Sequence, residues 1–129
     1  MILLDTCALL WLAGGARDRL SETALETIRR HRLELCVSAI SALEIGIKAA
    51  KGALALSLDP ATWFASALET HGVREIAVDG RIAATSTMLP RVHADPCDRI
   101  IVATALRYDA VILSPDEALR AYRGTNCRW

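Results

Sequence analysis

The sequence HADPCDRIIVATA, residues 93–105, sets two aspartates and a proline directly before an apolar run. Asp95 stands where a helix N-cap belongs, and Pro96 suits the first helical position because that position needs no backbone N–H donor. Asp98 follows in the first turn. Apolar residues then recur at helical spacing, at Ile101, Val102, Ala105 and Leu106. The stretch predicts a helix that starts near Pro96 with two carboxylates at its beginning.

Three further acids end or follow apolar segments elsewhere in the chain: Asp5, Glu44 and Asp116. Each acid has a purely structural explanation when it is taken alone. Asp5 would cap a helix, Glu44 would pair with Lys48 four residues on, and Asp116 would complement a helix dipole. The two acids of the 93–105 stretch would likewise cap their helix. Only a common location of these acids in the fold would indicate a shared chemical role.

The chain has 129 residues, the size of a single domain that spans residues 1–129. Its hydrophobic fraction of 53% is high, which predicts that some apolar surface is buried against a partner. Lys and Arg total 15, as do Asp and Glu, so the sum carries no basic charge of the kind typical of nucleic-acid-binding proteins. Most of the basic residues are arginines, which suit bidentate contacts with phosphate but serve by default in structural ion pairs.

The four cysteines lie far apart and form no CxxC pair or zinc-ligand spacing: Cys7, Cys36, Cys97 and Cys127. We expect them to be reduced thiols. Asp5 interrupts the N-terminal apolar stretch, and no positively charged segment precedes it. No apolar run approaches the roughly 20 residues that a membrane-spanning helix needs. These features predict a cytoplasmic protein without a membrane segment.

Short apolar runs alternate with amphipathic runs, which is typical of an α/β fold with a mainly parallel sheet. Strands are predicted at residues 1–4, 35–37, 75–78 and 110–113, with a fifth on the edge at 126–129. Helices are predicted at 7–12, at 22–32 after Ser21, from Ser38 or Ser41 to 51, at 59–71, at 81–88, from 96 onward, and at 117–122. The predicted sheet therefore has four to five strands.

Parallel strands bring the loops that follow them to one carboxyl edge of the sheet. Asp5 follows the first strand, Asp116 follows the fourth, and Asp98 opens the helix that leads into the fourth. We therefore expect these acids and Glu44 to converge. Carboxylates packed together repel one another, which raises their pKa values unless a cation joins them. A ligand set made only of oxygen atoms favours Mg²⁺ or Mn²⁺ over Zn²⁺.

Four segments resemble, in order, the PIN-domain ribonucleases, and specifically the VapC-type toxins of bacterial toxin–antitoxin pairs. The segments are DTCALLWL at 5–12, VSAISALEIGIK at 37–48, HADPCDRIIVATA at 93–105 and LSPDEALRAY at 113–122. The resemblance covers nearly the whole chain and implies a PIN-like three-layer α/β/α fold. It assigns the family's four acidic positions to Asp5, Glu44, Asp98 and Asp116, and it sets Ser114 where threonine is frequent.

Three residues depart from the family pattern. Cys7 and Cys97 stand where a histidine and an aromatic residue are expected, and Leu43 stands where a tryptophan is common before the glutamate. We interpret these departures as changes in packing or at the rim of the pocket, because none of them replaces an acid.

The resemblance implies metal-dependent hydrolysis of RNA phosphodiester bonds, and the acids independently allow it. Mg²⁺ would be held chiefly by Asp5 and Asp98, with Glu44 and Asp116 binding it directly or through water. Supporting roles are expected for Thr6, Ser114 and Asp95, with Asp95 mainly a structural cap; no residue is expected to bind an organic cofactor. A histidine mechanism is not supported, because His31 and His71 lie in or at the end of predicted helices. His93, near the acids, is expected to shape its loop.

The resemblance also implies a small cognate antitoxin protein that covers the acidic pocket with an arginine, and a homodimer. An alternative is a non-nuclease metal-binding or phosphoacceptor signalling module with an acidic pocket. Such receiver-like domains carry paired acids after the first strand and a late lysine, whereas here Leu4 precedes Asp5 and no lysine follows Lys51. A catalytically inactive scaffold is a third interpretation, which the presence of all four acids argues against.

Overall fold

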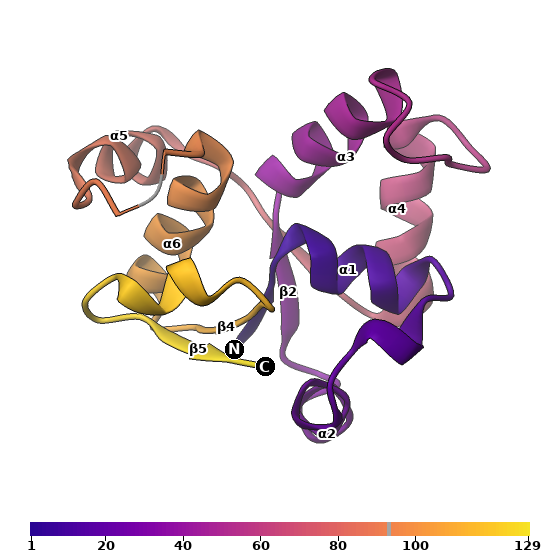
Figure 1. The fold of residues 1–129 in the computed structure, drawn as a ribbon, viewed down its shortest axis with the longest axis horizontal. Helices are drawn as coiled ribbons and strands as arrows, with labels where there is room; N and C mark the ends of the chain where they lie inside the picture. Colours follow the sequence, from indigo (N-terminus) through magenta and orange to yellow (C-terminus); the bar gives the residue numbers. More distant parts are fainter. Residues whose placement is uncertain (93) are drawn as a thin grey trace.

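The computed structural model describes residues 1–92 and 94–129 and confirms the predicted parallel α/β architecture (Figure 1). The five strands pair in parallel, in the order β3-β2-β1-β4-β5. They are β1 (Ile2–Leu4), β2 (Leu35–Ser38), β3 (Arg74–Ile76), β4 (Val111–Leu113) and β5 (Asn126–Arg128). The predicted edge strand at the C-terminus is therefore present, whereas His93, which was expected to shape its loop, lies outside the described residues.

Six α-helices and two 3₁₀ segments connect the strands in the described part of the chain. They are α1 (Thr6–Ala13), η1 (Arg17–Arg19), α2 (Glu22–Arg30), α3 (Ile40–Ala50), α4 (Pro60–His71), α5 (Gly80–Met88), α6 (Pro96–Tyr108) and η2 (Glu117–Ala121). The longest of them, α6, has 13 residues. None of the described helices combines the length and apolarity that crossing a membrane requires.

Alternate residues of the central strand β1 supply two separate cores. Ile2 and Leu4 pack with α1, α2, α3 and α4 on one face, whereas Leu3 packs with α6 on the other. The alternation follows from the two-residue period of a strand. Figure 1 shows α5 and α6 on one side of the sheet and α1, α3 and α4 on the other. The predicted three-layer α/β/α arrangement is thus confirmed.

The predicted capping residues set most of the helix boundaries. Ser21 accepts a hydrogen bond from the Ala24 N–H at 3.0 Å, and Asp59 accepts one from the Thr62 N–H at 3.0 Å. Gly72 ends α4 in the left-handed region, at φ 64°, where a residue with a Cβ atom is strained. These local signals explain why the helix ends agree closely with the sequence pattern.

The start of α3 differs from the prediction. Its N-cap is Ala39, which has no side chain able to accept a hydrogen bond, rather than Ser38 or Ser41. The Ser38 hydroxyl instead accepts from the Ile40 N–H at 3.2 Å, and Ser41 is buried inside the first turn. A serine that follows a strand can therefore support the helix start without occupying the cap position. The short segment η1 was not predicted.

The core between the sheet and α6 contains a buried hydroxyl without a hydrogen-bond partner among the described residues. Tyr122 is 2% exposed, and its neighbours in this cluster include Ile101, Ile112 and Leu119. Burying a hydroxyl without a partner costs free energy relative to an apolar group of the same shape.

We therefore expect Tyr122→Phe to increase the free energy of unfolding by about 1 kcal/mol, as measured by urea denaturation. The matched control is Tyr108→Phe, because Tyr108 is 42% exposed and its hydroxyl can be hydrated, so its loss should change stability little. A loss of stability in Tyr122→Phe would contradict the expectation and would mean that the hydroxyl has a partner.

Candidate metal centre at the carboxyl edge of the sheet

The strand order reverses direction at β1, the central strand of the sheet. β2 lies on one side of β1 and β4 on the other, so the connections that follow them leave toward opposite faces of the sheet. Open α/β sheets bind ligands at such a point, outside the carboxyl ends of the strands. The Asp5 N–H donates to the Leu113 carbonyl at 3.1 Å, which holds the ends of β1 and β4 together.

Asp5, Ser114 and Asp116 form a connected group at this edge. One Asp5 oxygen accepts from the Ala8 N–H at 2.7 Å and so caps α1, while the Ser114 hydroxyl donates to the other oxygen. The Ser114 oxygen in turn accepts from the Asp116 N–H at 3.0 Å. Asp116 caps η2 by accepting from the Ala118 N–H at 2.9 Å. Ser114 therefore ties the two acids that follow β1 and β4.

Glu44 reaches the same edge from α3 and is held by hydroxyl groups. The Thr6 hydroxyl donates to Glu44 Oε1 at 2.8 Å, and the Ser41 hydroxyl lies 2.9 Å from the same Thr6 oxygen. Thr6 and Ser41 are both buried. Thr6 follows Asp5 directly in the chain, so its hydrogen bond to Glu44 brings the acid on α3 close to the acid that follows β1.

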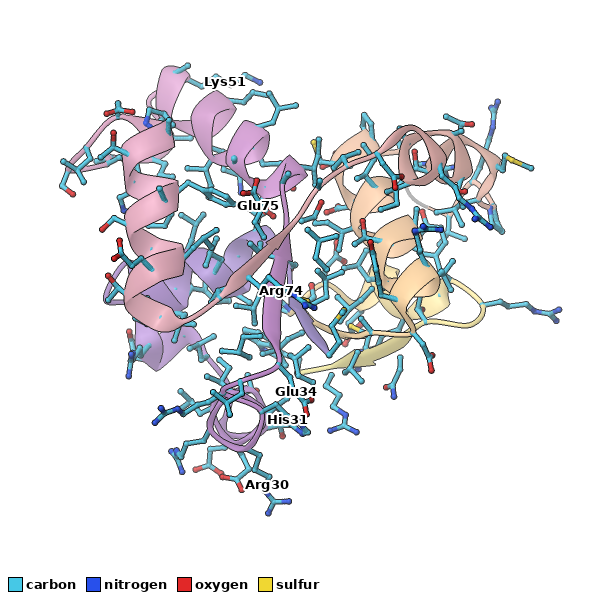
Figure 2. All side chains as sticks on the ribbon, turned by 180° about the vertical axis from the view of Figure 1, so that it is seen from behind. Arg30, His31, Glu34, Lys51, Arg74 and Glu75 are labelled. Carbon is cyan, nitrogen blue, oxygen red and sulfur yellow. The ribbon has the colours of Figure 1, made fainter. Side chains whose placement is uncertain are left out.

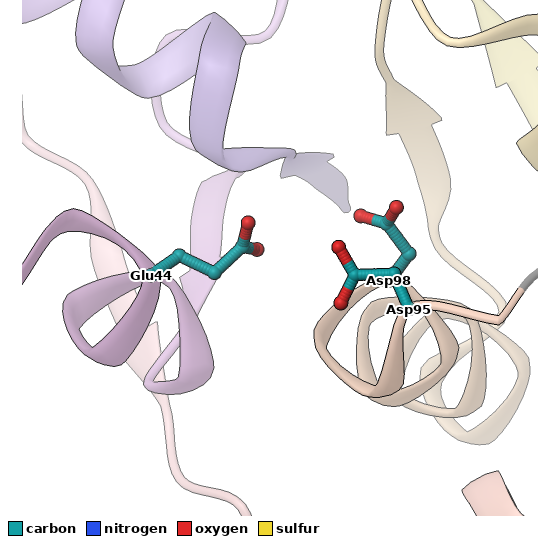
Figure 3. Close-up of side chains that lie close together, drawn as sticks. All are labelled: Glu44, Asp95 and Asp98. Atoms are coloured by element: carbon teal, nitrogen blue, oxygen red, sulfur yellow. The ribbon is translucent and has the colours of Figure 1, made fainter. Parts of the chain in front are cut away.

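The start of α6 brings two more carboxylates opposite Glu44. Figure 3 shows Glu44 extending from α3 toward Asp95 and Asp98 across the gap between the helices. One carboxylate oxygen from each of the three residues lies within 4.8 Å of the others. All three side chains are partly buried, so they remain accessible to an ion.

This spacing fits a divalent cation. Oxygens on opposite sides of one octahedral Mg²⁺ are about 4.2 Å apart and adjacent ones about 3 Å, so oxygens within 4.8 Å of one another need to move closer by at most about 2 Å to share one ion. Side chains on neighbouring helices accommodate such a shift by small rotations. Carboxylate oxygens are the ligands preferred by hard cations such as Mg²⁺ and Mn²⁺. The described residues at this edge thus fit a metal centre.

Burial raises the free energy of the ionised forms of Asp5 and Glu44. It is the largest cause that raises the pKa of Asp5, from 3.8 to about 6; hydrogen bonds from Ser114 and Ala8 oppose it, and the charges of Glu44 and Asp116 add to it. Burial likewise raises the pKa of Glu44; the Thr6 hydrogen bond lowers it, the Asp95 charge raises it and the Lys48 charge lowers it. The predicted increase in pKa is thus present, but desolvation rather than mutual repulsion is its main cause.

The predicted site residues fall into two adjoining groups. Glu44 and Asp98 meet with Asp95 in the group of three, and Asp5 and Asp116 meet through Ser114. Asp95 caps α6, as expected, by accepting from the Cys97 N–H at 2.9 Å. Its position beside Glu44 and Asp98 goes beyond the mainly structural role predicted for it. Ser41 was missed, although its spacing of three residues before Glu44 sets both on one helix face.

Comparison with known proteins identifies the family. The model of the PIN domain matches residues 2–124. The chain belongs to the PIN-domain family. Over 123 residues it is 33% identical to "Ribonuclease VapC22" of Mycobacterium tuberculosis (strain ATCC 25618 / H37Rv), an alignment that covers 95% of this chain and 92% of that protein.

Solved structures share the fold of this PIN domain. A toxin–antitoxin complex from Klebsiella pneumoniae superposes with a TM-score of 0.68 at 22% identity, covering 97% of this chain and 95% of that one. VapBC2 from Rickettsia felis, bound to a DNA fragment from its promoter, gives a TM-score of 0.69 at 13% identity, covering 99% of this chain and 98% of that one. The parallel sheet and its helical layers are therefore common to these proteins.

Two of the three departures from the family pattern lie beside the acids of this PIN domain. Burial raises the pKa of the Cys7 thiol, and the charge of Asp5 raises it further. Burial also raises the pKa of the Cys97 thiol, to about 11, and the charges of Glu44, Asp95 and Asp98 add to the effect. Leu43 is 53% exposed, so the third departure lies on the protein surface. All four cysteines are free thiols.

The described histidines lie at the other edge of the sheet. His31 ends α2 just before β2, and its Nδ1 lies 3.1 Å from Glu34 Oε2; Figure 2 shows this pair below the sheet. His71 ends α4 just before β3. Residues that precede parallel strands lie at the amino edge, so neither ring reaches the acids. This arrangement agrees with the expectation that a histidine pair does not act in catalysis.

The raised pKa of Asp5 makes the metal-free fold sensitive to pH. A carboxyl whose pKa is higher in the folded state contributes stability fully below about 3.8, and that contribution is lost as the pH rises through about 6. We expect Asp5→Asn, which mimics the neutral acid and keeps an acceptor for the Ala8 N–H, to match wild type at pH 4. At pH 8 in EDTA it should be more stable than wild type, by at most about 3 kcal/mol.

Urea denaturation of both proteins at each pH measures this difference. A stability difference that stays constant between pH 4 and pH 8 would contradict the proposed cost of ionising Asp5. Glu117→Gln, which neutralises an exposed acid on η2, is the control and should show no such trend.

Proposed function

We propose that this PIN domain is a Mg²⁺-dependent endoribonuclease that acts as the toxin of a toxin–antitoxin pair. The observation that carries the proposal is the convergence of Glu44, Asp95 and Asp98, whose oxygens lie within 4.8 Å of one another. The 33% identity to a protein named "Ribonuclease VapC22" supports the same reaction. Mn²⁺, which has similar ligand preferences, would substitute for Mg²⁺.

The residues of the site would have two kinds of role, as ligands of the metal and as partners that hold those ligands in place. Bound Mg²⁺ supplies an activated water molecule and positive charge next to the phosphate. Asp98 and Asp5 would be its chief ligands, with Glu44 and Asp116 binding directly or through water. Thr6 holds Glu44 in place, and Ser114 holds Asp5. Because the nucleophile is water rather than the ribose 2′-hydroxyl, the products should carry 5′-phosphate and 3′-hydroxyl ends.

We infer that a small antitoxin protein inhibits the enzyme in the cytoplasm by covering this site. An arginine of such a partner matches the paired carboxylates, because its guanidinium binds two oxygens at once. The known structures similar to this chain include "Toxin-antitoxin complex from Klebsiella pneumoniae". Co-purification from cells that carry the neighbouring gene tests the inference, and absence of a captured small protein together with harmless expression would contradict it.

We also infer a homodimer. Leu43 and Ile47 are 53% and 42% exposed, and both lie on α3 within one turn of Glu44. An exposed apolar face beside the acids supports association that sets two acidic pockets along one groove. Light scattering at micromolar concentration should give the mass of two chains, about twice 14.0 kDa. A mass of one chain would contradict the inference.

Two substitutions separate the metal ligand from the helix cap. Asp98→Asn should abolish RNA cleavage while leaving the apo fold as stable as wild type or slightly more stable, because it removes one of several neighbouring carboxylates. Asp95→Ala should lose about 1 kcal/mol of stability with the cap but keep most of its activity where it remains folded. Asp95→Asn, which retains a capping oxygen, isolates the effect of the charge.

Cleavage of a labelled RNA, with Mg²⁺ and with EDTA, is the measurement for all three variants. If Asp98→Asn cuts RNA at the wild-type rate, the assignment of Asp98 is wrong. If wild-type cleavage survives chelation, the metal-dependent reaction itself is wrong.

A further inference from the structure

Arg99, the arginine of the HADPCDR sequence, lies in the first turn of α6. Among the described residues, its side chain binds backbone carbonyl groups rather than the acids. Its side chain meets the end of α5, where a proline has removed a backbone donor. In a helix the Ser86 carbonyl would accept from the N–H of residue 90, but Pro90 has none. Arg99 Nε donates to that carbonyl at 3.1 Å instead. The guanidinium therefore replaces the hydrogen bond that the proline removes.

The same guanidinium binds two more carbonyl groups, just beyond the end of α5. Nη2 donates to the Leu89 oxygen at 2.7 Å, and Nη1 donates to the Pro90 oxygen at 2.9 Å. The three bonds use the planar fork of an arginine, whose donors point in fixed and different directions. The end of α5 is thereby fastened to the beginning of α6, two helices that pack along each other.

The backbone of Arg99 belongs to the first turn of α6. Its N–H donates to the Asp95 carbonyl at 3.2 Å, the ordinary hydrogen bond of a helix start. The side chain that binds the end of α5 is thus anchored in the turn that carries Asp95 and Asp98. Asp95 and the adjacent Asp98 are the two acids that face Glu44. The packing of α5 on the start of α6 therefore bears on where these two acids stand.

We propose that Arg99 is a positioning residue that sets the geometry of the metal centre by clamping the end of α5 to the start of α6. It acts on Asp98 by fixing the first turn of α6, which Asp95 caps, and it contacts neither metal nor RNA. The inference rests on the proposed function to the extent that Asp98 binds a divalent cation. Partners that orient metal ligands typically change metal affinity by 10- to 100-fold when they are altered.

Arg99→Lys tests the clamp, because lysine keeps the charge but its single ammonium does not span three carbonyls. We expect Mn²⁺ binding, measured by calorimetry on the folded variant, to weaken about tenfold. RNA cleavage should fall at limiting Mn²⁺ and recover at saturating Mn²⁺. Arg107→Lys is the matched control, since Arg107 is exposed near the other end of α6, and it should bind Mn²⁺ like wild type.

Val73→Ala is the second control, because Val73 is buried in the other core and its truncation lowers stability without approaching the acids. It should lower the melting temperature but leave the Mn²⁺ affinity unchanged. If Arg99→Lys does not fold, Arg99→Gln serves in its place, since it retains donors without the fork.

Wild-type Mn²⁺ affinity in a folded Arg99 variant would overturn the proposal and leave Arg99 a purely structural residue. Failure of the ribonuclease proposal gives a different result. In that case wild-type protein binds Mn²⁺ but does not cut RNA, and the affinity comparison still decides the role of Arg99. A wild-type protein that binds no Mn²⁺ would overturn both.

Discussion

The parallel pairing of β1 with both β2 and β4 is the constraint on which the candidate site depends. It aligns the ends of these strands, so that Asp5 and Ser114 become neighbours although 109 positions separate them in the chain. It also directs α3 and α6 to opposite faces, where Glu44 on α3 and Asp98 on α6 extend toward each other beyond the strand ends. The sheet thus concentrates negative charge at one edge of a chain whose formal net charge is zero.

This concentration of negative charge destabilises the metal-free fold and favours the binding of a cation. Burial raises the pKa of both Asp5 and Glu44, so their ionised forms are costly without a cation. Hydrogen bonds from Ser114, Thr6 and backbone N–H groups keep the carboxylates in place despite that cost. A divalent cation relieves the cost, which couples metal binding to stability. A phosphoacceptor module would gather acids in the same way, but the match to the PIN domain favours a nuclease.

Local signals predicted most of the fold. Asp95 and Pro96 predicted the start of α6, Gly72 predicted the end of α4, and the alternation of strand and helix patterns predicted the parallel sheet. The convergence of acids followed from parallel topology, and the ligand assignments stay predictions. What the sequence did not reveal depends on how α6 packs with α3 and α5: Asp95 lies near Glu44, and Arg99 binds the Ser86 carbonyl. A capping aspartate and an arginine in a helix are common in any sequence. Their roles here depend on tertiary contacts, which the sequence pattern does not show.

A crystal structure of the protein grown with Mn²⁺ tests the central claim most directly, because the anomalous signal locates the ion without any assumption about activity. The account predicts a peak within coordinating distance of an Asp98 oxygen and of at least one more acid among Asp5, Glu44, Asp95 and Asp116. A peak elsewhere, or no peak at saturating Mn²⁺, would contradict the claim that the carboxyl edge of this sheet is a metal centre.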